Sequence, residues 1–488
     1  MDSVCTHCGA LHFLDERLSN SSKVSPKYSV CCLQGQISLP LPSLPPQPLR
    51  DLLNGTDPRS RVFREKIRRY NAAFAFTSSG ARLTTARLAG TEGPYSFMMQ
   101  GAIYHQMGSL LPNGDDAPSY AQLYIYDDQQ AALDARSANN DHELNRGVMA
   151  ELQGMFMQHN PLVPLYKAAH EWFMRQPPEQ RNDLMARIVL EPTADGRRYN
   201  LPTANEVAAI IPGSGENEQV DKHRQIGIRL QSGDLQFISH LNPLYAPLHY
   251  VLLFPRGEQG WHIHIPSLQG TNGNRHAEHV SQRCYYSYVL HPRIIHGSEV
   301  DYLFRAGRLL QEYMVDAWAS VEASNLAWIQ HHQKEIRADL YQGLLDAVNA
   351  SDEGVNLAEQ GQRIILPSTH PGSSRHMYQL FQDSMAICRR FRKPDIFLTM
   401  TANPNWPEVQ AALLDLAGGD HTRKQDAADR PDIVARVFHL KKQALLKLIK
   451  DGFFGELAAD VYTIEFQKRG LPHMHLLIFL REPYKIRD

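Results

Sequence analysis

The stretch ADVYTIEFQKRGLPHMHLLIFL, residues 459–480, determines which fold the C-terminal part of the chain adopts. Two apolar-rich runs, 459–467 and 473–480, flank a short turn that contains Gly470 and Pro472. Runs of this kind joined by a short turn are typical of two antiparallel strands. We therefore expect a hairpin, and with it a sheet, near the end of the chain.

Two histidines on the second strand point to chemistry at this hairpin. His473 and His475 are two residues apart, so both imidazoles project from one face of the sheet. On the first strand Glu465 and Gln467 share a face, and the hairpin brings one of them beside the histidines. Two imidazoles and one oxygen ligand, with positions left open, suit Mg²⁺, Mn²⁺ or Zn²⁺, and such a metal can polarise a phosphate oxygen. Taken alone, the pattern also fits half-buried histidines held by hydrogen bonds.

The segments before the hairpin are expected to complete the sheet and flank it. Residues 396–401 alternate in the manner of a strand with two unlike faces. Residues 374–391 and 432–450 have helical spacing, and Gly452 stands where the second helix ends.

Upstream, the pattern is mixed. Residues 141–176 and 302–349 have helical spacing, and residues 121–127 and 249–255 are expected to be short strands. In the helix over 302–349, an apolar stripe predicts a core-facing side. The stripe consists of Leu310, Tyr313, Ala317, Val321, Ser324 and Trp328.

Four of the six cysteines lie within the first 32 residues, at Cys5, Cys8, Cys31 and Cys32. Six cysteines in 488 residues are too few for a disulfide scaffold, and such clustering in a reducing compartment favours a metal site, here Zn²⁺. The four cysteines are the expected zinc ligands, but adjacent side chains tend to diverge. The fourth position is therefore left open between the second of Cys31 and Cys32 and a spare ligand, His7 or His12. Buried structural thiols are the alternative.

The segment EFQKRGLPHMH, residues 465–475, resembles the HUH motif of rolling-circle replication initiators in the form that Helitron transposases use. KPDIFLTMTANPNWPEV, residues 393–409, resembles the strand motif that precedes it in that family. Further segments similar to the family cover most of the chain. They include CCLQGQISLP (31–40), FREKIRRYNAAFAFTSSGA (63–81), LLFPRGEQGW (252–261) and YYSYVLHPR (285–293).

The resemblance implies a Rep-type endonuclease domain, a small antiparallel sheet flanked by helices. If the metal ligands of the family are carried over to the matching positions of this sequence, His473 and His475 bind Mg²⁺ or Mn²⁺. Glu465 or Gln467 is then the third ligand. The reaction of the family joins the 5′ end of single-stranded DNA to a tyrosine, which makes single-stranded DNA the expected partner.

The chain also departs from the family. Helitron transposases carry paired tyrosines on a helix downstream of the motif and then a helicase, whereas Tyr484 is the only tyrosine after His475 here. Tyr484 is expected at a strand exit, so we assign no catalytic tyrosine in this chain. The sequence has no GxxxxGK[ST] loop, and we expect no ATP site.

We therefore expect the N-terminal part of a Helitron transposase, which binds metal and DNA and whose intact parent nicks and joins strands. The alternative is a non-catalytic or domesticated remnant of a transposon that binds DNA or protein. A stand-alone metallohydrolase is disfavoured, because no general base accompanies the histidines.

Basic residues next to the predicted sheet are the best candidates for contacts with DNA phosphates. Their local charge matters more than the net charge of −2, which argues mildly against a dedicated nucleic-acid coat. The candidates are Arg389, Arg390, Arg392, Lys393 and Arg469.

The fold class expected is α+β and multidomain, with an incomplete HUH-type antiparallel sheet at the C-terminus. The start of the sequence lacks the features of a signal peptide, and no apolar run is long enough to span a membrane, so we expect a nuclear or cytoplasmic protein. The expected domains are a cysteine-rich segment with a proline-rich linker (1–49), an α+β region (50–248), a largely helical middle region (249–390) and a partial endonuclease domain (391–488).

Overall fold

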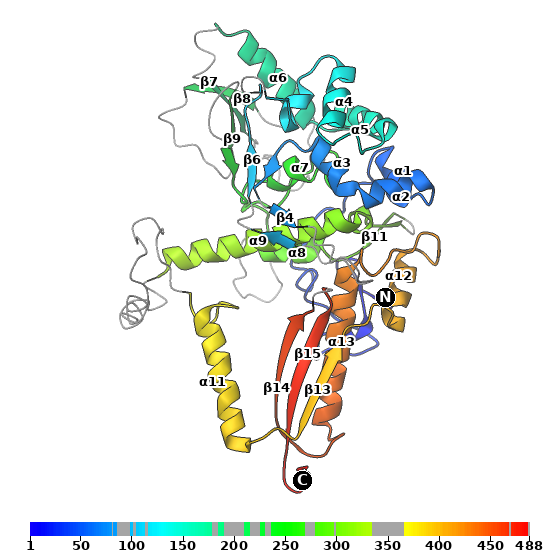
Figure 1. The fold of residues 1–488 in the computed structure, drawn as a ribbon, viewed down its shortest axis with the longest axis vertical. Helices are drawn as coiled ribbons and strands as arrows, with labels where there is room; N and C mark the ends of the chain where they lie inside the picture. The colour runs from blue at the N-terminus through cyan, green and yellow to red at the C-terminus, as the bar shows by residue number, and fades with distance from the viewer. Residues whose placement is uncertain are drawn as a thin grey trace. The chain divides into compact units, whose positions relative to one another are not determined.

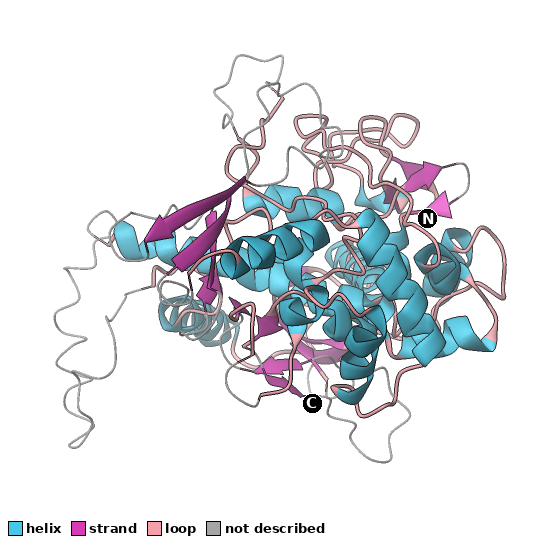
Figure 2. Cartoon of the chain, turned by 90° about the horizontal axis from the view of Figure 1, so that it is seen from above, coloured by secondary structure: helices cyan, strands magenta, loops and turns pink. Residues whose placement is uncertain are grey.

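The computed structural model describes residues 1–80, 82–84, 98–100, 104–112, 116–177, 184–189, 209–214, 225–229, 236–268, 279–296, 299–333, 366–467 and 470–486. The chain divides into two compact units. The first consists of Met1–Ala317 with Pro404–Val437, and the second of Trp318–Asn403 with Phe438–Asp488. Helices are combined with small antiparallel sheets, which confirms the α+β class (Figures 1 and 2).

The first unit contains most of the helices, and α9 and α13 continue from it into the second unit. Its helices are α1 (Leu49–Asn54), α2 (Pro58–Glu65), α3 (Ile67–Phe74), α4 (Gln129–Ala138), α5 (Arg146–His159), α6 (Leu162–Met174), α7 (Tyr245–His249), α8 (Gln282–Val289), α9 (Gly307–His331), α12 (Pro407–Leu416) and α13 (Pro431–Lys450), with the 3-10 turns η1 (Leu14–Glu16), η2 (Tyr120–Tyr124) and η4 (Tyr302–Arg305).

The strands of the first unit form small sheets in which every described pairing is antiparallel. The orders are β1-β2, β10-β6-β3, β4-β5, β8-β7-β9 and β11-β12. The strands are β1 (Ser3–Val4), β2 (Leu11–His12), β3 (Ser78–Ser79), β4 (Arg82–Thr84), β5 (Met98–Gln100), β6 (His105–Met107), β7 (Leu184–Val189), β8 (Ala209–Ser214), β9 (Gln225–Arg229), β10 (Gln236–Ile238), β11 (Ile294–His296) and β12 (Glu299–Val300).

Two of the expected strands in this unit are absent. The segment 121–127 begins inside η2, and no strand covers 249–255, which follows α7 as a buried irregular segment. There, the Asn71 side chain donates to the carbonyl oxygen of His249 and accepts from the backbone N–H of Leu252. A side chain thus satisfies backbone groups that a sheet would otherwise pair, so the segment is buried without being a strand.

The apolar stripe on α9 is confirmed over its first part only. Leu310, Tyr313, Ala317 and Val321 are buried, as expected, whereas Trp328 is 53% exposed. The Trp328 ring stacks on His332 one turn later instead of entering a core. The helices expected within 141–176 are confirmed as α5 and α6.

The second unit is built on the predicted hairpin. Strand β15 (Pro472–Leu480) is the central one of three, between β13 (Ile396–Thr401) and β14 (Leu457–Phe466), and both pairings are antiparallel. Helix α11 (Ser374–Phe391) precedes β13, and α13 precedes β14 (Figure 1). These helices and strands agree with the sequence prediction, and Gly452 has the positive φ of 93° expected just after α13.

The two faces of this sheet differ. On one face Met474, Leu476 and Ile478 are fully buried, and burial of side chains of this size contributes roughly 1.5–3 kcal/mol each. The Nζ atom of Lys442, from α13, lies 5.2 Å from the ring centre of Tyr462, which pairs with Leu476. Helix α13 therefore packs on the apolar face, and by the strand alternation the opposite face carries the histidines.

Among the described residues, no helix combines the length and the apolar character that a membrane crossing requires.

Candidate metal centres

The face of the sheet opposite α13 gathers Glu465, His473 and His475. Within this group one ligand atom of each residue lies within 4.8 Å of those of the other two. The Nε2 atom of His475 is 2.9 Å from Oε1 of Glu465, and the two imidazole rings are 4.5 Å apart, centre to centre. The alternation of β15 alone predicts that the histidines share a face, and the β14–β15 register adds the carboxylate.

This geometry fits a divalent cation with some positions left open. Two neighbouring ligands of an octahedral ion with bonds of about 2.1 Å stand about 3.0 Å apart. The 2.9 Å contact between His475 and Glu465, a hydrogen bond in this structure, also falls at that spacing. His473 is buried, whereas Glu465 is exposed, so a ligand can reach the group from solvent on the side of Glu465.

Two neighbours of the histidines were missed by the sequence reasoning. The Oγ1 atom of Thr401 lies 2.6 Å from Nδ1 of His473, which leaves Nε2 of that ring as the ligand atom. Phe397 stacks on His475, with ring centres 5.7 Å apart and planes at 12°. Thr401 and Phe397 both lie on the face of β13 opposite its apolar face. The alternation of residues 396–401 in the sequence already indicated that these two side chains share a face.

The alternative third ligand, Gln467, is placed differently. Gln467 lies just past the end of β14, where its backbone N–H donates to the carbonyl oxygen of Leu471, and the residue is exposed. Glu465 is thus the acidic member of the group. Arg469 lies outside the described residues.

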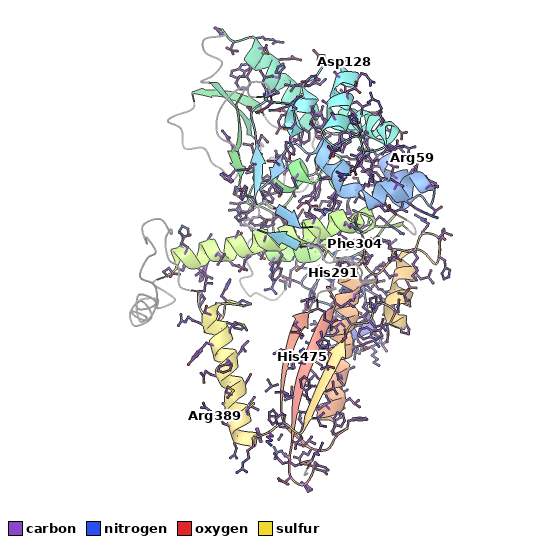
Figure 3. All side chains as sticks on the ribbon, in the orientation of Figure 1. Arg59, Asp128, His291, Phe304, Arg389 and His475 are labelled. Atoms are coloured by element: carbon purple, nitrogen blue, oxygen red, sulfur yellow. The ribbon has the colours of Figure 1, made fainter. Side chains whose placement is uncertain are left out.

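The other basic candidates stand at the opposite end of the sheet. Arg389 and Arg390 close α11, and Arg392 and Lys393 follow it, all exposed (Figure 3). The histidines instead pair with the other end of β13, because Thr401 is opposite His473. The length of β13, roughly 17 Å, separates the two groups, so they cannot contact one phosphate.

Tyr484 is also distant from the histidines. It follows β15, and a side chain at Gly455 would overlap its ring, so the ring lies against Gly455. From His475 to Leu480 the strand spans roughly 17 Å, which is too far for Tyr484 to attack a phosphate held at the histidines.

The four N-terminal cysteines form a second group in the first unit. All four sulfurs lie within 4.8 Å of one another, and Cys5, Cys31 and Cys32 are buried. The Sγ atoms of Cys5 and Cys32 are 3.8 Å apart, and those of Cys31 and Cys32 are 3.9 Å apart. Four sulfurs at about 2.3 Å from one tetrahedral ion stand about 3.8 Å apart, so the group could bind zinc.

The fourth position, which the sequence left open, is occupied by a cysteine, because both Cys31 and Cys32 face the group. Backbone turns explain how both do. Gly9 and, after Cys32, the residues Leu33, Gln34 and Gly35 have positive φ, which folds the chain back around the sulfurs. The Gly35 N–H donates to the Cys32 sulfur at 3.3 Å. Neither His7 nor His12 belongs to the group.

Arg293 is a contact of this group that the sequence did not indicate. Its Nε donates to the carbonyl oxygen of Cys8 at 3.0 Å, and its Nη2 lies 3.5 Å from the Cys8 sulfur. Hydrogen bonds from Cys31, Cys32 and Arg293 hold the pKa of the Cys8 thiol well below its usual range. A thiolate is the form that binds metal.

Comparison with known protein families finds a match to part of the chain. Residues 285–478 match the family described as the Helitron helicase-like domain at the N-terminus, and the match includes His473 and His475. The chain contains a Helitron helicase-like domain. This region is therefore related to Helitron transposases, as the motifs around 393–409 and 465–475 indicated. The cysteine group and the motifs at 31–40, 63–81 and 252–261 lie outside the matched residues, whereas the motif at 285–293 lies within them. Among curated proteins, none matches the chain.

Proposed function

We propose that the Helitron helicase-like domain binds single-stranded DNA through a metal ion held by His473, His475 and Glu465. In an intact parent transposase, this site would position a phosphodiester for nicking and joining by a tyrosine. The observation that carries the proposal is the convergence of two imidazoles and one carboxylate on the open face of a small sheet.

The residues around the group have separate roles in this proposal. A bound Mg²⁺ or Mn²⁺ would act as a Lewis acid on a phosphate oxygen. Thr401 fixes the orientation of His473 through Nδ1, and Glu465 supplies the negative charge that favours a cation. Phe397 is 63% exposed beside His475 and offers a ring on which a base can stack.

Cleavage is not proposed for this chain. Tyr484 is far from the histidines, and Tyr462 of β14 lies on the opposite face of the sheet, paired with Leu476. We therefore expect no 5′-phosphotyrosine adduct when the chain is incubated with single-stranded DNA and Mn²⁺.

The direct test measures DNA binding during a metal titration. The fluorescence anisotropy of a labelled single-stranded oligonucleotide is followed as Mn²⁺ is added to the full chain. The affinity should rise about tenfold or more with Mn²⁺, and the double variant His473→Ala/His475→Ala should lose that response. His439→Ala removes an exposed histidine of α13 and serves as the matched control.

The outcomes separate the proposal from its alternative. Binding that is the same with and without Mn²⁺, in the wild type and the double variant, contradicts metal-dependent binding and favours a non-catalytic DNA-binding remnant. An absence of DNA binding under all conditions contradicts both, and leaves a remnant that binds protein.

We also propose that Cys5, Cys8, Cys31 and Cys32 hold one structural Zn²⁺. The support is the pair of sulfur distances that match a zinc tetrahedron, together with the burial of three of the four sulfurs. Elemental analysis of the purified chain should give one zinc per molecule. In the variant Cys32→Ser the zinc content should fall below one per molecule. A full complement of zinc in that variant would contradict the assignment.

A further inference from the structure

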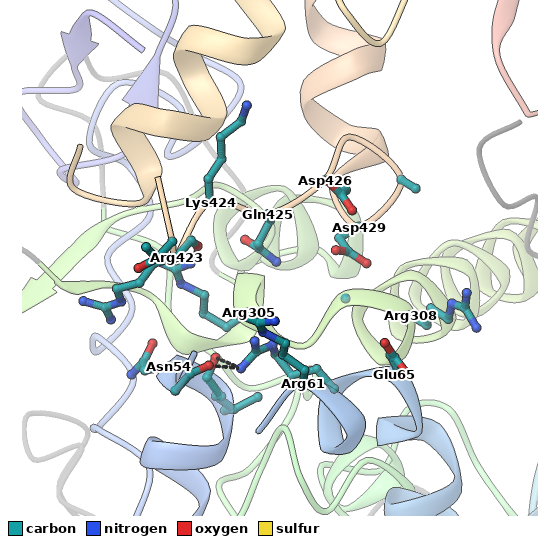
Figure 4. Close-up of a pocket in the computed structure, with 16 residues that line it drawn as sticks. Asn54, Arg61, Glu65, Arg305, Arg308, Arg423, Lys424, Gln425, Asp426 and Asp429 are labelled. Carbon is teal, nitrogen blue, oxygen red and sulfur yellow. Dashed lines mark hydrogen bonds between the residues drawn. The ribbon is translucent and has the colours of Figure 1, made fainter. Parts of the chain in front are cut away.

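The first unit contains a cavity of about 650 Å³ with a strongly positive lining. Its walls come from three segments: the end of α1 with α2, the residues at the start of α9, and the loop before α13 (Figure 4). Three carboxylates line it, from Glu65, Asp426 and Asp429. Six cations line it as well: Arg61, Arg64, Arg305, Arg308, Arg423 and Lys424. Six positive and three negative groups leave a formal excess of three positive charges.

Two of these arginines are held by neutral partners. Nη1 of Arg64 donates to the carbonyl oxygens of Leu52, at 3.0 Å, and Gly55, at 2.7 Å. Arg305 donates to the carbonyl oxygens of Arg423, at 2.8 Å, and Leu416, at 3.1 Å. Carbonyl oxygens orient a guanidinium without cancelling its charge, so both side chains are fixed and still cationic.

Two other arginines of the lining form no ion pair with any residue that the structure describes. The Nε atom of Arg423 is buried and has no hydrogen-bond partner among the described residues. A buried donor in that state is costly, which makes an acceptor at this position favourable. Arg61 is exposed on α2, and within the described part of the chain its side chain forms no ion pair.

The electrostatics of the cavity favour the binding of an anion. Burial, together with the charges of Arg423, Arg430 and Arg64, lowers the pKa of Arg305 to about 10. A depressed pKa for an arginine means that its positive charge is disfavoured by its surroundings, and a bound anion would remove that penalty. The volume is within the range of small-ligand pockets, and planar guanidinium groups match the oxygens of phosphate.

We propose that this pocket binds a phosphate group, with Arg61 and Arg423 as donors to its oxygens and with Arg64 and Arg305 supplying the positive field. The phosphate can belong to a single strand of DNA or to a free phosphate compound, since the chemistry of recognition is the same. The DNA source rests on the proposed function; phosphate binding in the pocket does not.

The test uses the full chain in metal-free buffer with two probes. Calorimetry measures the binding of pyrophosphate, and anisotropy measures the binding of a labelled 5′-phosphorylated oligothymidylate. The double variant Arg61→Gln/Arg423→Gln removes both free donors. The matched control is Arg59→Gln. Like Arg61, Arg59 is an arginine of α2, but it lies outside the cavity and pairs with Glu151.

The wild type should bind pyrophosphate saturably, and the double variant should bind it at least about tenfold more weakly, because charge-assisted hydrogen bonds are lost. Arg59→Gln should bind within about twofold of the wild type. Absence of saturable pyrophosphate binding, or equal affinity in the double variant, overturns the proposal. Equal circular dichroism spectra of all variants show that the loss is not a loss of fold.

The second probe identifies the source. If the double variant also loses affinity for the oligothymidylate and pyrophosphate competes with it, the pocket takes a phosphate of the DNA strand. If only pyrophosphate binding changes, the pocket takes a free phosphate compound. If the wild type binds pyrophosphate but no DNA, the pocket stands and the proposed DNA-binding function fails.

Discussion

The Nε2 atom of His475 lies 2.9 Å from Oε1 of Glu465, although the residue directly opposite Glu465 in the sheet is His473. The carboxylate therefore reaches diagonally across the hairpin. His473 is left to hydrogen-bond with Thr401 on the other neighbouring strand. Each histidine thus has its own partner, and all three strands contribute to one group.

Replacing Glu465 should weaken metal binding without affecting the fold. In Glu465→Gln, the neutral amide removes the only carboxylate of the group, so Mn²⁺ affinity should fall about tenfold or more. Electron paramagnetic resonance of free Mn²⁺ measures the change. Asp460→Asn, which alters a carboxylate on the other face of the same strand, should leave the affinity unchanged.

Thr401 acts through His473, and its loss should be felt at the metal. Thr401→Val keeps the shape and removes the 2.6 Å contact with Nδ1, so the ring is no longer held in one orientation. Mn²⁺ affinity should drop roughly tenfold, as is typical when a ligand loses its supporting hydrogen bond. The control is Thr399→Val. Thr399 lies two residues before Thr401 on the same face of β13, where it pairs with His475. Equal effects of the two substitutions would argue against this role.

The cysteine group should stabilise the first unit through its metal. Cys5→Ser removes one of four sulfurs, and the thermal midpoint of the variant should fall and lose its sensitivity to a chelator. Differential scanning calorimetry with and without chelator gives both values. Cys388→Ser changes a cysteine of α11 outside the group. A chelator that leaves the wild-type midpoint unchanged would speak against a structural metal.

Asp301 should make stability depend on pH. Its burial raises the pKa of the carboxyl from 3.8 to about 6 in the folded chain. Between these values the folded state binds more protons than the unfolded state, so the free energy of unfolding falls as pH rises from about 4 to 6. The loss amounts to about 3 kcal/mol at neutral pH.

The variant Asp301→Asn keeps an acceptor for the Leu303 N–H and cannot ionise. It should therefore be more stable than the wild type at pH 7, and the gap should shrink at pH 5. Urea denaturation at the two pH values checks this. A gap that is the same at both would contradict the assigned ionisation.

Local sequence patterns predicted the second unit well. The elements over 374–391, 396–401 and 459–480 each follow from a periodicity within one segment. The shared face of His473 and His475 follows from the same alternation. The β13–β15 register joins residues 72 positions apart, such as Thr401 and His473, and no single segment contains that information.

The errors arise where tertiary contacts override local pattern. The segment 249–255 has the composition of a buried strand, but its backbone groups are partly paired by the Asn71 side chain from a distant helix. Likewise, the contact of Arg293 with Cys8 joins residues 285 positions apart. The distribution of charge along the sequence gave no sign that three separate segments combine into a cationic cavity.

The central claim is that the three residues of the hairpin hold one divalent ion. A crystal structure of the chain grown with Mn²⁺, with anomalous scattering recorded, tests it most directly. We expect one anomalous peak about 2.1 Å from Nε2 of His473, Nε2 of His475 and a carboxylate oxygen of Glu465. An anomalous peak at another place in the chain, or no peak beside these three residues at saturating Mn²⁺, would contradict the claim.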